Sequence, residues 1–398
     1  MELTLKQSKG LDIAVQRYKD REKYTVISGY AGAGKSTLVK FIVSALSGLG
    51  VDPETEVCYA CFTGKACQVL QKKGNRNCLT LHKLLYETRP TEDGRFIHLP
   101  KEDIEYSIVV VDEVSMAPKT LMDLLFSHNV HVICLGDPFQ LPPIEKNEDN
   151  HLLDNPHIFL DEIMRQAAES EIIRLTLNIR TGKPFEQEFK NGNEIKIFNA
   201  NELNEGMLFW ADQVLCATNN TRMMLNNEMR RLLGRGDKPE NGDKIICLRN
   251  YWETLSIGTQ NPLVNGTIGY LDSSYPTFVT IPNWCRCDIK NVDGIRGNFI
   301  SDSGDTYKSL FMDKKMILTG TKSLDWKTEY KLNRSWKTKS LIPMEFAYGY
   351  AITCHKAQGS EWDKVLVREE GFPFAELEHA RWLYTAATRA AEKLVLVR

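Results

Sequence analysis

Short apolar runs alternate with amphipathic stretches along the first half of this 398-residue chain. A helix is expected over residues 7–18, and four apolar runs typical of buried strands follow it: YTVIS at Tyr24, VCYACF at Val57, SIVVVDE at Ser107 and HVICLGD at His131. Such runs have no polar face, so both of their faces must be covered, as they are in parallel sheets between helices. The pattern therefore predicts an α/β fold.

A second, weaker series of the same kind follows a predicted domain boundary. An amphipathic helix is expected over residues 162–179, and the sequence RTGKP at 180–184 is a glycine-then-proline stop. Beyond it lie the apolar run QVLCAT at Gln213, a helix over 220–233, and the runs AYGYAIT at Ala347, KVLVRE at Lys364 and KLVLVR at Lys393. The chain is thus predicted to contain two α/β domains.

Two stretches break this alternation. From about Gly242 to Ser340, the short β-like runs KIICLR, GTIGYL, TFVTI and SLFMDK are separated by Gly, Asn, Asp and Pro, which indicates a small inserted antiparallel barrel. The stretch Glu87–Asp103 contains the turn dipeptide Asp93-Gly94 and is typical of a β-hairpin. The predicted domains are residues 1–182 with a hairpin at 87–103, residues 183–241 and 341–398, and an insertion at 242–340.

The composition is that of a globular protein, with 42% apolar and 26% charged residues. No apolar run reaches membrane-spanning length, and the N-terminal sequence MELTLKQSKGLDIAV lacks the basic and apolar regions of a secretory signal. We therefore expect a cytoplasmic protein with no membrane partner. Because the net charge is −2, a nucleic-acid partner would need a locally basic groove.

Ten cysteines are scattered along the chain, mostly inside apolar runs. They are predicted to be reduced and buried. Cys58 and Cys61 have C-x-x-C spacing, but the chain has no second such pair, and alternation along a strand points the two side chains to opposite faces. No zinc or iron–sulfur site is expected.

The first apolar run leads directly into a glycine-rich turn and a helix, YTVISGYAGAGKSTLVK at residues 24–40. The spacing matches G-x-x-x-x-G-K-[ST], in which backbone N–H groups and a helix N-terminus surround a polyphosphate. Lys35 would reach the outer phosphates and Ser36 would bind Mg²⁺. The predicted nucleotide contacts in this loop are Gly29, Ala31, Gly32, Ala33, Gly34, Lys35, Ser36 and Thr37.

Polar side chains follow the third and fourth predicted strands, at the edge where open α/β sheets bind ligands. Asp112 and Glu113 end the run SIVVVDE, and Gln140 lies in the sequence GDPFQLPP after the fourth run. Alone, each could be ordinary turn chemistry. With the phosphate loop in the same sheet, Asp112 is predicted to hold Mg²⁺, Glu113 to orient the attacking water and Gln140 to touch the γ-phosphate or that water.

Five motifs occur in order along the chain: GYAGAGKST, VVVDEVS, LGDPFQLPP, AITCHKAQGSEWD and LYTAATRA. Together they resemble the motifs of superfamily-one helicases, and more narrowly those of the Dda and RecD-like branch. The resemblance covers nearly the whole chain, and five ordered motifs are far more specific than one. It implies two RecA-like domains with ATP between them, single-stranded DNA across their top, a pin hairpin in the first and an SH3-like barrel in the second.

The resemblance also implies roles for individual residues. Gln7 would read the adenine, Arg389 would be an arginine finger, and Arg165 would be a second cation at the γ-phosphate. Phe96 would wedge between bases as part of the pin. The implied DNA contacts are Thr63, Gly64, Lys65, Thr80, His82, Thr353, His355, Lys356 and Gln358, and Gly359 would lie beside the nucleotide.

We therefore expect a monomeric, Mg-ATP-dependent DNA helicase that moves 5′ to 3′ on single-stranded DNA and acts at junctions with duplex, in a bacterial cell or a phage-infected host. Single-strand-binding, replication or recombination proteins are candidate partners. The polarity rests on the resemblance alone. Because the predicted pin is short, the alternatives are a protein-displacing translocase and an RNA helicase with weak unwinding. A small-molecule kinase or a non-catalytic scaffold fits the intact catalytic residues less well.

Overall fold

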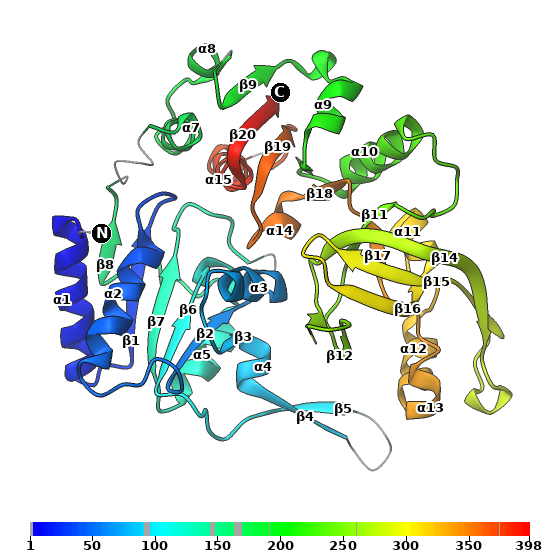
Figure 1. Ribbon diagram of the computed structural model, residues 1–398, viewed down its shortest axis with the longest axis horizontal. Helices are drawn as coiled ribbons and strands as arrows, with labels where there is room; N and C mark the ends of the chain where they lie inside the picture. The colour runs from blue at the N-terminus through cyan, green and yellow to red at the C-terminus, as the bar shows by residue number, and fades with distance from the viewer. Residues whose placement is uncertain are drawn as a thin grey trace. The chain divides into compact units, whose positions relative to one another are not determined.

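The computed structural model describes residues 3–90, 96–143, 148–162, 169–190, 192–259, 261–373 and 375–398. The chain divides into two compact units (Figure 1). Unit 1 contains Met1–Tyr86, Pro100–Thr218 and Thr353–Arg398, and unit 2 contains Glu87–Leu99 and Asn219–Ile352. Each unit is described by itself.

The first sheet of unit 1 has six parallel strands in the order β3-β2-β6-β7-β1-β8. Their bounds are Tyr24–Gly29 (β1), Val57–Cys61 (β2), Cys78–Thr80 (β3), Ile108–Val111 (β6), His131–Gly136 (β7) and Ile158–Leu160 (β8). The four apolar runs predicted as strands are therefore confirmed. Every residue of β6 and β7 is buried, as expected for strands that are covered on both faces.

Helices cover both faces of this sheet, and alternate strand residues belong to two separate cores. The helices are Leu5–Lys19 (α1), Lys35–Ser47 (α2), Gly64–Lys72 (α3), Leu81–Leu85 (α4) and Lys119–Ser127 (α5). Ile27 packs with Leu38 and Ile42 of α2, whereas its neighbour Val26 packs in the core that contains Leu84 and Leu125. Figure 1 shows α1 and α2 side by side on one face.

The second sheet of unit 1 has five strands in the order β18-β10-β19-β20-β9, and its pairs β10–β19, β19–β20 and β20–β9 are parallel. Its strands are Ile195–Phe198 (β9), Gln213–Cys216 (β10), Ala351–Thr353 (β18), Trp362–Arg368 (β19) and Ala390–Val397 (β20). Its helices are Glu171–Arg180 (α7), Glu186–Phe189 (α8), Glu205–Trp210 (α9), Cys354–Ala357 (α14) and Glu376–Ala387 (α15). Unit 1 therefore holds both predicted α/β sheets.

Two predicted elements differ in the structure. The helix expected over 162–179 begins only at Glu171 among the described residues, because Ser170 has the extended backbone of an N-cap. The run AYGYAIT forms two strands in two sheets: β17 (Phe346–Tyr348) and β18. Gly349 and Tyr350 separate them, and a side chain at Gly349 would lie 3.1 Å from the Ile245 backbone, so the chain leaves the first sheet at a position tightly packed against a neighbouring strand.

Unit 2 is built on an antiparallel sheet in the order β16-β15-β14-β11-β17. The strands are Lys244–Cys247 (β11), Ile268–Thr280 (β14), Asn291–Ser301 (β15) and Thr306–Asp313 (β16), with a separate pair Tyr251–Leu255 (β12) and Pro262–Leu263 (β13). The helices are Asn219–Leu232 (α10), Lys314–Thr319 (α11), Trp326–Asn333 (α12) and Trp336–Lys339 (α13). GTIGYL and TFVTI belong to one strand, β14, which forms a long curved ribbon with β15 (Figure 1). The predicted antiparallel pairing is present, whereas the SH3-like insertion and the domain boundaries stay predictions.

A two-stranded sheet occupies the place of the predicted hairpin. Its strands are Tyr86–Pro90 (β4) and Phe96–Pro100 (β5). The turn Asp93-Gly94 and the side chain of Phe96 lie outside the described residues. The pin role stays a prediction.

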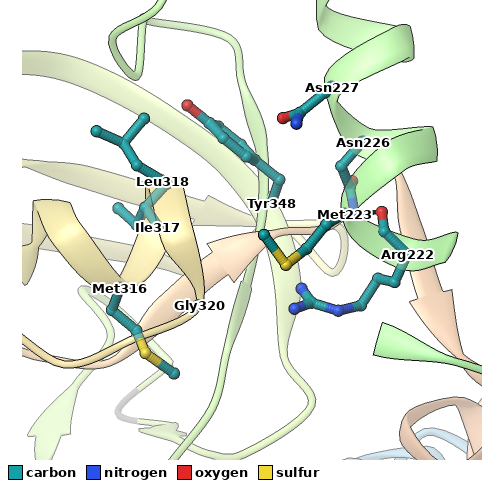
Figure 2. Close-up of a pocket in the computed structure, with 9 residues that line it drawn as sticks. All are labelled: Arg222, Met223, Asn226, Asn227, Met316, Ile317, Leu318, Gly320 and Tyr348. Atoms are coloured by element: carbon teal, nitrogen blue, oxygen red, sulfur yellow. Dashed lines mark hydrogen bonds between the residues drawn. The ribbon is translucent and has the colours of Figure 1, made fainter. Parts of the chain in front are cut away.

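A small pocket lies between α10 and α11 in unit 2 (Figure 2). Its free volume, about 10 Å³, is that of a single water molecule. The Tyr348 hydroxyl in its wall is buried and has no hydrogen-bond partner among the described residues. Beside it, the side chain of Asn226 bonds both the N–H and the C=O of Ala351, which ties α10 to the chain leading into β18. We regard this pocket as a packing feature.

The cysteine prediction is confirmed for eight of the ten thiols, since Cys285 and Cys287 are only half-buried. All are free, and eight are buried. Burial raises the pKa of Cys58 to about 12, so this thiol is unreactive at neutral pH. Within the described part of the chain, no helix combines the length and apolar character needed to cross a membrane.

Candidate active site

The loop between β1 and α2 has the conformation of a phosphate cradle. Gly32 and Gly34 have φ values of 76° and 77°, the left-handed region that glycine enters without strain. A side chain at Gly29 would lie 2.7 Å from the Leu160 carbonyl oxygen, so only glycine fits there. Gly34 offers no side-chain cap to α2, and the first N–H groups of that helix therefore face the loop.

The ammonium group of Lys35 lies at the mouth of this loop. It donates hydrogen bonds to the carbonyl oxygens of Gly29 at 2.6 Å and Tyr30 at 3.1 Å. Ser36 is exposed beside it, and Thr37 is half-buried on the same turn. The structure therefore gathers the predicted loop residues around one concave stretch of backbone.

Asp112 and Glu113 follow β6 at the edge of the sheet. Asp112 Oδ1 accepts a 2.9 Å hydrogen bond from the backbone N–H of Glu113. Glu113 has a φ of 51°, an uncommon conformation for a residue with a side chain, and such strain is concentrated at functional sites. Desolvation by the surrounding protein raises the pKa of both carboxyl groups, and nearby Lys35 partly opposes this for Asp112.

Arg389, from the second sheet, lies beside Glu113. Its Nη1 is 3.7 Å from Glu113 Oε1, and its guanidinium is held by the carbonyl oxygens of Thr385 and Ser360. Desolvation raises the pKa of Glu113, and the positive charge of Arg389 partly offsets that effect. The other carboxylate oxygen, Oε2, is buried and has no hydrogen-bond partner among the described residues. The predicted base and the predicted finger are therefore neighbours.

The loop after β7 connects this site to the second sheet. The Leu141 N–H donates a 3.1 Å hydrogen bond to Thr385 Oγ1, and its C=O accepts one of 3.1 Å from Gln358 Nε2. Gln140 Oε1 is buried without a partner among the described residues. Gln358, which the resemblance assigns to DNA, is only 4% exposed and bonds this loop. Its DNA contact stays a prediction.

Sequence reasoning missed Tyr384 and Asp137. The Tyr384 hydroxyl donates a 2.6 Å hydrogen bond to Asp137 Oδ2 and accepts one of 3.0 Å from the Ala31 N–H in the cradle. Both residues stand inside motifs that the sequence displays, LYTAATRA and LGDPFQLPP. The available signal was that each carries a polar group in the same motif as a residue with a predicted role, Arg389 for Tyr384 and Gln140 for Asp137.

Gly359 brings α14 close to the first sheet. It has a φ of 76°, and a side chain there would lie 3.2 Å from Thr63 Oγ1 and 3.3 Å from Glu113 Oε2. Thr63 caps α3, since its Oγ1 accepts a hydrogen bond from the Ala66 N–H. Thr63, which is predicted to contact DNA, therefore lies next to Gly359, which is predicted to lie beside the nucleotide.

The other predicted DNA contacts are dispersed over unit 1. Thr80 is buried and caps α4 through a 3.2 Å bond from the Lys83 N–H. His82 is exposed next to the rings of Phe62 and Tyr86. The remaining members lie at the starts of α3 and α14: Gly64 is buried, Lys65, Thr353 and His355 are half-buried, and Lys356 is exposed. Burial lowers the pKa of His355, which favours the neutral ring.

Gln7 has a structural role in addition to its predicted contact with adenine. It is 1% exposed, forms the capping box of α1 with Thr4, and its amide lies 3.4 Å from the Gly34 carbonyl oxygen. It therefore touches the cradle, and the adenine contact stays a prediction. Arg165 lies outside the described residues. Among those that are described, no three His, Cys, Asp or Glu side chains cluster as a metal site would require.

Family models match two parts of the chain. Residues 7–199 match a model described as an AAA domain, and residues 348–397 match a UvrD-like helicase C-terminal domain. The ATP-dependent DNA helicase dda of Enterobacteria phage T4 is 25% identical over 98% of this chain and 97% of that protein. The ATP-dependent RecD2 DNA helicase of Deinococcus radiodurans is 25% identical over 93% of this chain and 46% of that protein.

Among solved structures, the Pif1 helicase from Bacteroides bound to single-stranded DNA superposes with a TM-score of 0.54. The alignment covers 100% of this chain and 92% of that chain at 19% identity. At this identity the likeness concerns the fold, an α/β architecture with two RecA-like domains.

Proposed function

We propose that this chain, which belongs to the superfamily-one helicases of the Dda and RecD-like group, hydrolyses Mg-ATP to move 5′ to 3′ along single-stranded DNA and to unwind duplex. It is an ATP-hydrolysing enzyme. The single observation that carries the mechanism is the approach of Arg389, from the second sheet, to Glu113, from the first. Because the two residues come from different sheets, ATP hydrolysis depends on the position of one sheet relative to the other.

The cradle binds the phosphates of ATP. Backbone N–H groups between Gly29 and Ser36 face the α- and β-phosphates, and Lys35 exchanges its two carbonyl partners for the outer phosphate oxygens.

Ser36 and Asp112 would hold Mg²⁺. Both offer the oxygen ligands that this ion prefers, and the raised pKa of Asp112 indicates a desolvated carboxylate whose charge a cation would stabilise. Two protein ligands are enough for a Mg²⁺ ion that takes its others from phosphates and water. When bound, the ion neutralises negative charge on the β- and γ-phosphate oxygens.

Glu113 orients and deprotonates the attacking water. Its Oε2 is the acceptor that the described residues leave unsatisfied, and Gln140 Oε1 is a second acceptor of the same kind. Since a neutral carboxyl group cannot accept the proton, hydrolysis requires the ionised form of Glu113. Arg389 favours that form and also stabilises the negative charge that develops on the γ-phosphate in the transition state.

Motion follows from the contacts of α14 and α15. Thr385 and Gln358 both bond the loop that carries Gln140, and Gly359 touches Thr63 at the start of α3. A change at the γ-phosphate therefore reaches both segments predicted to grip DNA. Alternate gripping by the two segments as ATP is bound and hydrolysed would move the chain along a strand.

Duplexes with a single-stranded tail on either the 5′ or the 3′ end test this proposal. We expect ATP-dependent unwinding of the 5′-tailed substrate only, and none by the Glu113→Gln variant. Unwinding of the 3′-tailed substrate alone would contradict the polarity. ATP hydrolysis with protein displacement but without strand separation would support the second candidate, a translocase, which the shortness of β4 and β5, five residues each, favours.

A further inference from the structure

Helix α12 of unit 2, labelled in Figure 1, carries two exposed aromatic side chains, Trp326 and Tyr330. Trp326 is 72% exposed and Tyr330 is 46% exposed, and residues four apart lie side by side on a helix. The opposite face packs inward through Thr328 and Leu332, the latter in the core that contains Phe311. The helix is therefore held in place by that opposite face.

The same region carries a local excess of positive charge. Residues 314–339 contain eight Lys and Arg but only two Asp and Glu, although the whole chain has a net charge of −2. Both acidic residues have structural partners: Asp325 caps α12 through the Thr328 N–H, and Glu329 pairs with Arg249. Glu329 is neutralised by its ion pairs, whereas Asp325 keeps its negative charge beside Lys327. The region is still strongly basic, with eight basic residues against two acidic ones.

The basic side chains next to the rings are exposed. Lys327 lies on the same helix, with its ammonium 5.8 Å from the Trp326 ring, and Arg334 and Lys337 follow α12. Three other basic residues of the region have partners within unit 2: Lys322 pairs with Glu329, Lys331 bonds the Arg286 carbonyl and Lys339 pairs with Glu253. The exposed set Trp326, Lys327, Tyr330, Arg334 and Lys337 is called the α12 surface below.

We propose that the α12 surface binds a single-stranded polynucleotide, in addition to the strand held by unit 1. Phosphates would pair with the cations while bases stack on the two rings, the combination that proteins use to bind single strands of any sequence. A duplex hides the faces of its bases, so it offers nothing to the rings. An acidic peptide would satisfy the cations but leave both rings exposed.

This surface is independent of the ATP site. None of its residues belongs to the five sequence motifs, and unit 2 contains none of the cradle residues. Binding can therefore be measured without nucleotide, and a negative result would leave the proposed hydrolysis untouched.

The test uses the full chain and a fluorescent oligothymidylate, with salt concentration as a variable. Trp326→Ala/Tyr330→Ala should weaken the binding of a second oligothymidylate to each chain roughly ten- to hundredfold, and Trp326→Phe/Tyr330→Phe should restore most of it. Lys327→Glu/Arg334→Glu should lower the slope of the salt dependence by about 0.7 for each phosphate that the variant no longer neutralises. The matched controls are Phe209→Ala, an exposed aromatic of unit 1, and Lys9→Glu/Lys19→Glu on α1.

Crosslinking locates the binding surface directly. An oligonucleotide that carries 5-iodouracil should, after irradiation, label the peptide that contains Trp326 and Tyr330, and DNA and RNA versions would separate the two polynucleotides. Unchanged affinity in the alanine variant, or labelling only in unit 1, would overturn the proposal. The proposal would also be overturned if the variants lost binding to polyglutamate but kept their affinity for oligothymidylate, because the partner would then be an acidic protein.

Discussion

The hydroxyl of Tyr384 donates a 2.6 Å hydrogen bond to the carboxylate of Asp137 and accepts one of 3.0 Å from the backbone N–H of Ala31. One side chain of α15 thus joins the end of β7 to the phosphate cradle. Tyr384 is 1% exposed, and burial raises its pKa well above the usual value, so the hydroxyl remains protonated and able to donate. The bond connects the helix that precedes Arg389 to the loop that receives phosphate.

Tyr384→Phe should destabilise this connection. Removing the hydroxyl leaves the Asp137 carboxylate with the Phe139 N–H as its donor, and an unsatisfied buried polar group costs about 1–3 kcal/mol. We expect a lower Tm and a lower kcat for ATP hydrolysis with little change in KM. Tyr275→Phe, at a tyrosine that is 54% exposed, is the control. Equal behaviour of the two variants would show that the hydroxyl has no such role.

Arg389→Ala should reduce turnover far more than it reduces ATP affinity. An arginine finger acts on charge that develops only in the transition state, and its removal costs roughly 10³- to 10⁵-fold in kcat. Single-turnover hydrolysis and equilibrium binding of a fluorescent ATP analogue separate the two effects. Arg76→Ala removes an exposed arginine of the same unit and should behave like wild type. A defect confined to binding would assign Arg389 a different role.

Asp112→Asn should raise thermal stability at pH 8 in the absence of Mg²⁺. Desolvation raises the pKa of Asp112 above its ordinary value of 3.8, so the folded protein holds this proton more tightly than the unfolded chain, and ionisation opposes folding. The advantage of the variant should shrink as the pH falls through the raised pKa and vanish below about 3.8.

In the presence of Mg-ATP, wild type should instead be more stable than Asp112→Asn, because wild type gains more from the bound cation than the variant does. Differential scanning fluorimetry at several pH values measures both effects, with Asp12→Asn on the exposed face of α1 as the control. A variant that is less stable than wild type at pH 8 without the ion would contradict the interpretation of Asp112 as a desolvated cation ligand.

Gly359→Ala should uncouple the two segments that are predicted to grip DNA. The φ of 76° imposes strain of about 1–3 kcal/mol on a side-chain-bearing residue, and the new methyl group would lie 2.9 Å from the Ala66 side chain. Gly74→Ala is a matched control, since Gly74 also has a positive φ but open space around it. Stimulation of ATP hydrolysis by single-stranded DNA should fall in the first variant and persist in the second.

The sequence predicted the elements whose apolar residues are covered on both faces, as β6 and β7 show. It did not predict β9, since Ile195–Phe198 pairs with β20 alone and exposes Lys196, so only two of its residues are buried. Nor did it separate β17 from β18, because a continuous apolar run does not reveal that Gly349 is packed against another strand.

Motif spacing was enough to predict candidate site residues such as Lys35, for the outer phosphates, and Asp112, for Mg²⁺. It could not identify Tyr384, whose role depends on hydrogen bonds to residues 247 and 353 positions away. Gln358 shows the same limit in reverse: its motif implies DNA, whereas its side chain bonds Leu141 in the folded chain. Contacts between segments that lie far apart in the sequence can be identified only when the fold is known.

Steady-state ATP hydrolysis with and without single-stranded DNA tests the central claim most directly. Wild type and the exposed-site control Glu378→Gln should be strongly stimulated by the DNA, whereas Glu113→Gln should be about 10²- to 10⁴-fold slower and still bind the ATP analogue. Hydrolysis that is indifferent to polynucleotide would contradict the account of a motor and would favour a phosphotransferase that uses the same loop.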